Sequence, residues 1–125
     1  MIDCKDLRVG NWVYDGKRTQ FPMYVRAVGE DYVYLDFEGN ESDLWESEPK
    51  DLEGILITEE LLKKVGFDQS CEIFYFNGFE LTSTEFGYVP SVNLCEYYIG
   101  NPIFYVHELQ NLYQCLIRKE LKIEL

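Results

Sequence analysis

The chain has 125 residues, of which 23 are acidic and 11 are basic, so its formal net charge is −12 at pH 7. This length suits one domain or two very small modules packed together, and an apolar content of 46% is too high for a disordered chain. The charge disfavours direct contact with nucleic acids and with anionic membranes, because both need clustered Lys and Arg. No Lys or Arg occurs between Lys64 and Arg118.

The first part of the chain, residues 8–57, is typical of short strands joined by tight turns. Apolar and aromatic runs alternate there with turn residues, and the Asp15-Gly16 dipeptide is a strong hairpin signal. Four or five short strands in about 50 residues predict a small, strongly bent sheet or an SH3-like β-barrel. The strands are expected at residues 11–14, 23–28, 32–37 and 55–57.

A short helix is expected to begin after Thr58, whose hydroxyl can cap the helix N-terminus. Glu59 and Glu60 favour the positive end of the helix dipole, and Gly66 suits the position that follows the last helical residue. The apolar face of this helix is formed by Leu61, Leu62 and Val65.

Residues 70–99 return to strand character. The Asn77-Gly78 dipeptide predicts a tight hairpin between the segments 73–76 and 79–84. Further strand is expected at 88–89 and at 92–98, which makes an antiparallel sheet of about three strands.

A last helix is expected to open at Pro102, and residues 121–125 alternate weakly, as in a closing strand. Leu109 and Leu112 are predicted to be buried on an apolar stripe that also contains Tyr105, Tyr113 and Leu116. The opposite, solvated face is predicted to consist of His107, Asn111, Gln114 and Arg118.

These elements together predict an α+β fold. An SH3-like β module over residues 1–57 is followed by a short helix, an antiparallel sheet and a C-terminal helix over residues 58–125. We expect the two parts to share a core and to form one compact unit.

Three segments also point to a known group of proteins. The opening reads DLRVGNWV from Asp6, the middle helix reads LITEELLKKVGF from Leu56, and the closing helix reads YVHELQNLY from Tyr105. Together they resemble small uncharacterised acidic proteins of gut bacteria and their phages or mobile elements. The resemblance implies a shared fold and a phage or mobile-element context, and it implies no activity.

The cysteines and the single histidine carry no catalytic pattern. The four cysteines form no C-x-x-C pair, so no zinc site is predicted, and we expect buried, reduced thiols. His107 lies eight residues before Cys115 on one helix, about 12 Å along its axis, which is too far for a catalytic dyad. We interpret His107 as structural. The N-terminus has no apolar signal-peptide core, and no apolar stretch is long enough to span a membrane, so a cytoplasmic location is expected.

Residues 30–53 contain ten carboxylates and a single base, Lys50. An ordinary solvated face is the simplest interpretation, and a surface for a basic protein partner is the functional one. The candidate partner surface consists of Asp36, Glu38, Glu41, Asp43, Trp45, Glu46 and Glu48.

No catalytic residue, metal site or cofactor is predicted from the sequence. We therefore expect a non-enzymatic binding or adaptor protein. Two alternatives stay open: a mimic of nucleic-acid charge that occupies a basic site on a DNA-handling protein, and a small hydrolase that uses carboxylates. The oligomeric state does not follow from the sequence.

Overall fold

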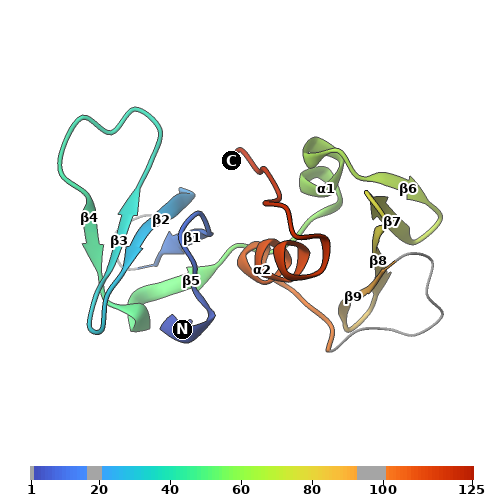
Figure 1. The fold of residues 1–125 in the computed structure, drawn as a ribbon, viewed down its shortest axis with the longest axis horizontal. Coiled ribbons are helices and arrows are strands. Elements are labelled where there is room, and N and C mark those ends of the chain that lie inside the picture. Colours follow the sequence, from blue (N-terminus) through green and yellow to red (C-terminus); the bar gives the residue numbers. More distant parts are fainter. Residues whose placement is uncertain (1, 17–20, 93–100) are drawn as a thin grey trace. The chain divides into compact units, whose positions relative to one another are not determined.

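The computed structural model describes residues 2–16, 21–92 and 101–125 (Figure 1). The chain divides into two compact units, a first unit within Met1–Ile55 and a second unit of Leu56–Glu124. Each unit contains an antiparallel sheet, and both α-helices of the described residues lie in the second unit. The predicted α+β class is confirmed. That the two parts share one core stays a prediction.

The first unit is built on a five-stranded sheet in the order β4-β3-β2-β1-β5, in which every neighbouring pair is antiparallel. Its elements are a 3-10 helix at Cys4–Asp6, β1 (Trp12–Asp15), β2 (Met23–Val28), β3 (Val33–Asp36), β4 (Trp45–Ser47), a 3-10 helix at Pro49–Asp51, and β5 (Leu52–Gly54). The prediction of a strand at residues 55–57 is wrong. Leu52–Gly54 pairs with β1 in its place, and Leu56 forms an isolated bridge with Tyr105 in the second unit.

Side chains alternate between two faces of this sheet, as a strand period of two requires. Val33 and Leu35 on β3 are fully buried, and Phe37 packs against the same core. Tyr34 and Asp36 lie between them on the opposite face. The buried core consists of Ile2, Leu7, Val13, Met23, Val25, Val33, Leu35 and Leu52.

The sheet of the first unit is strongly bent. In a flat sheet, three strand spacings of nearly 5 Å would hold β1 and β4 about 14 Å apart. The carboxylate of Asp15 on β1 nevertheless accepts hydrogen bonds from Trp45 Nε1 (3.0 Å) and Ser47 Oγ (2.6 Å) on β4. Among the described strands no pairing of β4 with β5 closes the sheet, so a closed SH3-like barrel stays a prediction.

The first hairpin is longer than its sequence signal predicts. β1 pairs with β2 in the register Val13 to Met23, which leaves more than two residues between the strands. The Asp15-Gly16 dipeptide therefore does not form a two-residue turn, and residues 17–20 lie outside the described part of the chain.

The second unit contains a four-stranded antiparallel sheet in the order β6-β7-β8-β9. Its elements are α1 (Glu59–Val65), β6 (Asp68–Ser70), β7 (Ile73–Phe76), β8 (Phe79–Thr84), β9 (Gly87–Val92) and α2 (Val106–Ile117). The Asn77-Gly78 hairpin is confirmed: Phe76 pairs with Phe79, and both turn residues have positive φ, 51° and 82°. β6 was not predicted, because its residues are polar and exposed and carry no hydrophobic pattern. The expected strand over 92–98 lies outside the described residues beyond Val92.

The caps of α1 are those that the sequence predicts. Thr58 Oγ1 accepts a hydrogen bond from the Leu61 amide (3.1 Å). Gly66 follows the last helical residue with a φ of 122°, and its amide donates to the carbonyls of Leu62 and Lys63.

The last helix, α2, begins later than expected. Ile103 exchanges backbone hydrogen bonds of 2.7 and 2.9 Å with Tyr88, so the chain is still extended just after Pro102. Tyr105 precedes the first helical residue, and its amide donates to Glu108 Oε1 (3.1 Å), as in a helix cap.

The buried stripe of α2 is rotated from the predicted one. It contains Val106, Leu109, Gln110 and Tyr113, at the i, i+3, i+4, i+7 spacing of one helix face. His107 is also buried, so its assignment to the solvated face was wrong, whereas Gln114 and Arg118 are exposed as predicted. Leu112 is only half-buried, because the stripe is centred closer to the Gln110 side of the helix.

Tyr113 anchors α2 on the sheet of the second unit. Its ring lies 6.0 Å from that of Phe76 and 5.5 Å from that of Phe79, and its hydroxyl accepts a hydrogen bond from Asn77 Nδ2 (3.0 Å). Beyond the helix, Leu121 and Ile123 alternate with exposed residues as predicted, but no strand pairing is formed there.

Candidate partner-binding surface

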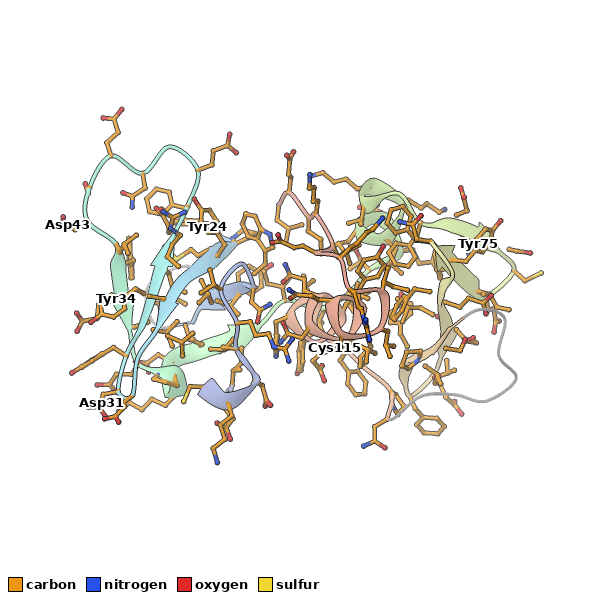
Figure 2. The ribbon with its side chains drawn as sticks, viewed as in Figure 1. Tyr24, Asp31, Tyr34, Asp43, Tyr75 and Cys115 are labelled. Carbon is orange, nitrogen blue, oxygen red and sulfur yellow. The ribbon has the colours of Figure 1, made fainter. Side chains whose placement is uncertain are left out.

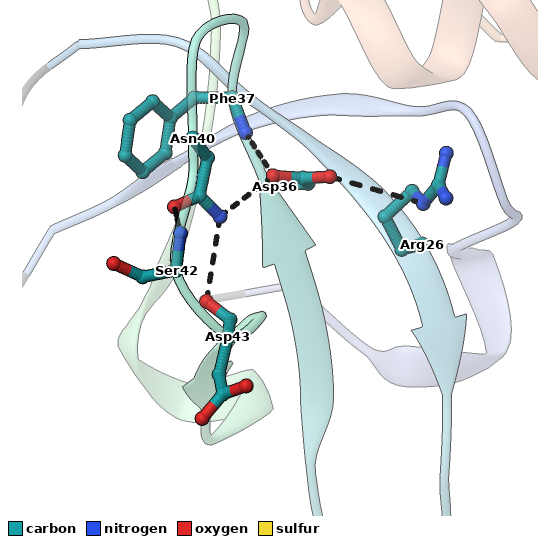
Figure 3. Close-up of polar contacts among 6 residues, drawn as sticks. All are labelled: Arg26, Asp36, Phe37, Asn40, Ser42 and Asp43. Atoms are coloured by element: carbon teal, nitrogen blue, oxygen red, sulfur yellow. Dashed lines mark hydrogen bonds and ion pairs between the residues drawn. The ribbon is translucent and has the colours of Figure 1, made fainter.

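The loop between β3 and β4 is held by hydrogen bonds around two side chains, Asp36 and Asn40 (Figure 3). Asp36 Oδ1 accepts from the Phe37 amide (2.9 Å) and from Asn40 Nδ2 (2.8 Å). Asn40 Nδ2 also donates to the Asp43 carbonyl (3.3 Å), and Asn40 Oδ1 accepts from the Ser42 amide (3.0 Å). We call residues 37–44 the acidic loop. These contacts hold its backbone in one conformation.

Asp36 supports the loop as an ionised carboxylate. The hydrogen bond from Asn40 lowers its pKa most, partial burial opposes this, and the Phe37 amide, the Arg26 guanidinium and the Tyr24 hydroxyl lower it further. Arg26 Nε lies 3.9 Å from Asp36 Oδ2. Because these groups already surround it, Asp36 positions the loop and is poorly placed to meet a partner directly.

Four of the candidate carboxylates are exposed and lie near one another in the chain, three in the acidic loop and one on β4: Glu38, Glu41, Asp43 and Glu46. Glu48 differs, since it is half-buried and its carboxylate lies 3.0 Å from Lys50 Nζ. The hydrogen bond that the Lys50 ammonium donates to Glu48 raises the pKa of Lys50. The single base of the acidic stretch is thus paired with a carboxylate away from the loop.

The acidic stretch does not form one continuous patch. Glu30 and Asp31 lie in the turn between β2 and β3, whereas Asp43 lies in the acidic loop that follows β3. Figure 2 shows Asp31 and Asp43 at opposite ends of β3. The carboxylates of the acidic loop and those of the β2–β3 turn therefore form two separate groups.

Trp45, the aromatic member of the predicted surface, faces the core of the first unit. It is half-buried, its ring lies 6.4 Å from that of Phe37, and its indole N–H is bonded to Asp15. Strand alternation places Trp45 and Ser47 on one face and the exposed Glu46 on the other.

The opposite face of the sheet carries aromatic residues that the sequence reasoning did not select. Trp12, Tyr14, Tyr24 and Tyr34 each alternate with buried residues, so they lie on the outer face, away from the core. The Trp12 and Tyr24 rings meet edge to face at 5.3 Å. The sequence signal was present, because on each strand these aromatics alternate with the apolar residues that form the core.

The outer face also carries carboxylates in register with the rings. Tyr24 is paired with Asp36 across β2 and β3, and Tyr34 is paired with Glu46 across β3 and β4. Residues directly opposite one another on an antiparallel pair have Cβ atoms about 4.5–5.5 Å apart. Each pair therefore places a phenol ring beside a carboxylate.

Exposed apolar side chains occur in the second unit as well, among them Leu56 (60% exposed), Phe86 (68%) and Phe104 (46%). Close by in the chain, Tyr105 stacks on His107 with ring centroids 5.8 Å apart. His107 is therefore fixed by packing, which agrees with the structural interpretation of its role.

Cys4, Cys71 and Cys115 form no disulfide bond within the described residues, and Cys95 lies outside them. The expected burial is wrong for Cys71 and Cys115, which are both exposed. Cys71 occupies a turn between β6 and β7 with a φ of 56°, and Cys115 lies on the face of α2 away from its buried stripe.

Within residues 2–16, 21–92 and 101–125, no group of three or more His, Cys, Asp or Glu side chains is arranged to hold a metal ion. Across the same residues, no helix has both the length and the apolar character needed to cross a membrane. No protein-family model, curated protein or solved structure matches this chain.

Proposed function

We propose that this protein is a non-enzymatic binding or adaptor protein whose first unit binds a basic protein partner. The observation that carries the proposal is the acidic loop, in which the Asp36 and Asn40 hydrogen bonds hold the backbone while Glu38, Glu41 and Asp43 stay exposed. An ordered loop loses less conformational entropy when a partner binds. Clustered carboxylates in a chain with a net charge of −12 also speed the encounter with a basic partner.

We also propose that the first unit is an SH3-like barrel and that the protein comes from a phage or mobile element. An SH3-like barrel is supported by the placement of β5 beside β1, by the 3-10 helix before β5 and by the bend at Asp15. The three segments that resemble small acidic proteins of phages and mobile elements support an origin in such an element, acting in the cytoplasm.

A mimic of nucleic-acid charge is a special case of this proposal, in which the basic partner is a DNA-handling protein. The same exposed carboxylates would then occupy a site that otherwise binds phosphates. A small hydrolase that uses carboxylates is the alternative of a different class, and steady turnover of a glycoside by the purified protein would favour it.

The experiment compares two triply neutralised variants in a pull-down from the native host. The loop variant carries Glu38→Gln, Glu41→Gln and Asp43→Asn. The matched control carries Asp68→Asn, Glu72→Gln and Glu85→Gln at exposed positions of the second unit. Each variant has a net charge of −12 + 3 = −9, so the two differ only in where charge is removed.

We expect a basic protein, identified by mass, to be captured by the wild type and by the control and to be lost from the loop variant. Equal loss from both variants would mean that net charge alone drives capture. Recovery of the wild type without any partner would count against an adaptor.

A further inference from the structure

We infer that the outer face of the first unit's sheet binds arginine side chains of an extended basic segment in the partner, at the pair formed by Tyr34 and Glu46. This inference rests on the proposed function and names the surface and the chemistry that would carry it. The acidic loop attracts the partner, and the tyrosine–glutamate pair recognises its guanidinium groups.

The face already binds one guanidinium of its own chain. Arg26, beside the irregularity between Val25 and Ala27 on β2, lies 3.9 Å from Asp36, which is paired across the strands with Tyr24. A tyrosine, a carboxylate on the neighbouring strand and an arginine therefore occur together on this surface.

The neighbouring cross-strand pair again combines a tyrosine with a carboxylate. Tyr34 on β3 is opposite Glu46 on β4, and Glu46 is exposed while Tyr34 is half-buried. Figure 2 shows Tyr34 and Tyr24 on the neighbouring strands β3 and β2. Within the described residues no ion pair to Glu46 is formed. The Tyr34–Glu46 pair thus offers a ring face and a carboxylate to a cation from another molecule.

A guanidinium suits this pair better than an ammonium does. It is planar, so it can stack on the Tyr34 ring while its N–H groups reach the Glu46 carboxylate. An ammonium is a compact, strongly hydrated charge that gains less from stacking. We therefore expect an arginine-bearing segment to bind more tightly than a lysine-bearing one.

An extended segment of the partner best matches the spacing between Tyr34 and the acidic loop. Side chains on one face of a strand are about 6.6–6.8 Å apart, which is also the spacing of alternate residues in an extended peptide. A segment with arginine at every second position can place one guanidinium at Tyr34 and others along the chain towards the exposed carboxylates Glu38 and Glu41, which follow β3.

The test uses a fluorescently labelled peptide of five residues in which arginine and glycine alternate. Fluorescence anisotropy measures how tightly the full-length protein binds it. We expect Tyr34→Leu and Glu46→Gln each to weaken binding about threefold or more, the size of one cation–aromatic or ion-pair contact at an exposed site. Tyr34→Phe keeps the ring face and should bind as the wild type does. The corresponding lysine peptide should bind more weakly.

A matched control lies in the second unit, where Tyr75 on β7 is exposed and is paired across the strands with Glu80 on β8. Glu80 already accepts a hydrogen bond from Ser91 Oγ (3.3 Å), whereas the exposed Asp68 on β6 is also opposite Tyr75, so this site has a ring and a carboxylate but no acidic loop after β7. Tyr75→Leu should therefore weaken binding less than Tyr34→Leu does. Equal weakening by Tyr34→Leu and Tyr75→Leu would overturn the inference.

Two further results separate this inference from the proposed function. If the loop variant loses the peptide while Tyr34→Leu and Glu46→Gln both bind as the wild type does, the proposed function stands and the inference fails. If the wild type binds neither peptide at low salt, the inference fails, and the pull-down decides the proposed function by itself. Tryptophan emission verifies that each first-unit variant is folded, since Trp12 and Trp45 are the two tryptophans of the chain.

Discussion

Replacing Asp15 with alanine should destabilise the first unit more than any other single loss of a carboxylate there. Asp15 is 1% exposed and bonds both Trp45 Nε1 and Ser47 Oγ across the bend of the sheet. In Asp15→Ala the buried Ser47 hydroxyl loses this partner, which costs about 1–3 kcal/mol. The Trp45 indole N–H loses one hydrogen bond, which costs about 0.5–1.5 kcal/mol. The two losses together lower the free energy of unfolding by about 1.5–4.5 kcal/mol.

Two optical signals allow this loss to be assigned to one unit. Both tryptophans lie in the first unit, and both α-helices of the described residues lie in the second. Urea unfolding followed by tryptophan fluorescence therefore reports on the first unit, and helical circular dichroism reports on the second. With a slope of about 1–3 kcal/mol per molar urea, the fluorescence midpoint of Asp15→Ala should fall by about 0.5 M or more.

The controls are Asp31→Ala, at an exposed position of the same unit, and Ser47→Ala. Asp31→Ala should change the unfolding free energy by no more than about 0.5 kcal/mol, as exposed sites usually do. Ser47→Ala should cost less than Asp15→Ala, and the double variant should cost less than the sum of the two. Equal midpoints for Asp15→Ala and Asp31→Ala would refute the claim that Asp15 holds the bend. A parallel shift of the dichroism midpoint would show that the two units unfold together.

Three further predictions concern single side chains. Leu109→Ala should cost about 2–5 kcal/mol, because Leu109 is fully buried, whereas the exposed Gln114→Ala should change stability by less than about 0.5 kcal/mol in urea unfolding. Asn40→Ala removes the hydrogen bond that lowers the pKa of Asp36 most. In an NMR titration of this variant, the carboxyl carbon of Asp36 should therefore titrate at higher pH than in the wild type. Because the folded-state pKa lies below the unfolded one, the stability from Asp36 is present above the unfolded value and is lost as the pH falls through the folded value. An unchanged titration midpoint in Asn40→Ala would contradict this. Gly87→Ala should cost about 1–3 kcal/mol by thermal unfolding, since Gly87 has a φ of 109° and a Cβ there would lie 2.9 Å from the Phe104 ring; a neutral effect would mean that the turn relaxes.

Features that depend on near neighbours were predictable from the sequence. The Thr58 cap and the Gly66 end of α1 involve contacts within a few residues, and so does the Asn77-Gly78 turn. The alternation in β3 follows from the strand period together with the need to bury Val33 and Leu35. Local hydrogen bonds and side-chain period are properties of the chain itself, so these elements could be derived without a structure.

Other features were decided by contacts between distant residues. β6 has no pattern of its own and is a strand because Gln69 pairs with Phe74. The buried stripe of α2 includes Val106 and Gln110, which the sequence pattern did not select. The helix is held against the sheet by the Tyr113 ring, which contacts Phe76 and Phe79, more than thirty positions earlier in the sequence.

The candidate surface also has one property that the sequence shows and others that only the tertiary structure decides. The sequence alone showed that carboxylates are concentrated between residues 30 and 53. The tertiary structure separated Asp31 from Asp43 at opposite ends of β3, as Figure 2 shows, and turned Trp45 inward to Asp15. It placed Tyr34 beside Glu46 on the outer face. Which face a side chain occupies depends on strand register and on the bend of the sheet, and both are set by pairs of residues far apart in the chain.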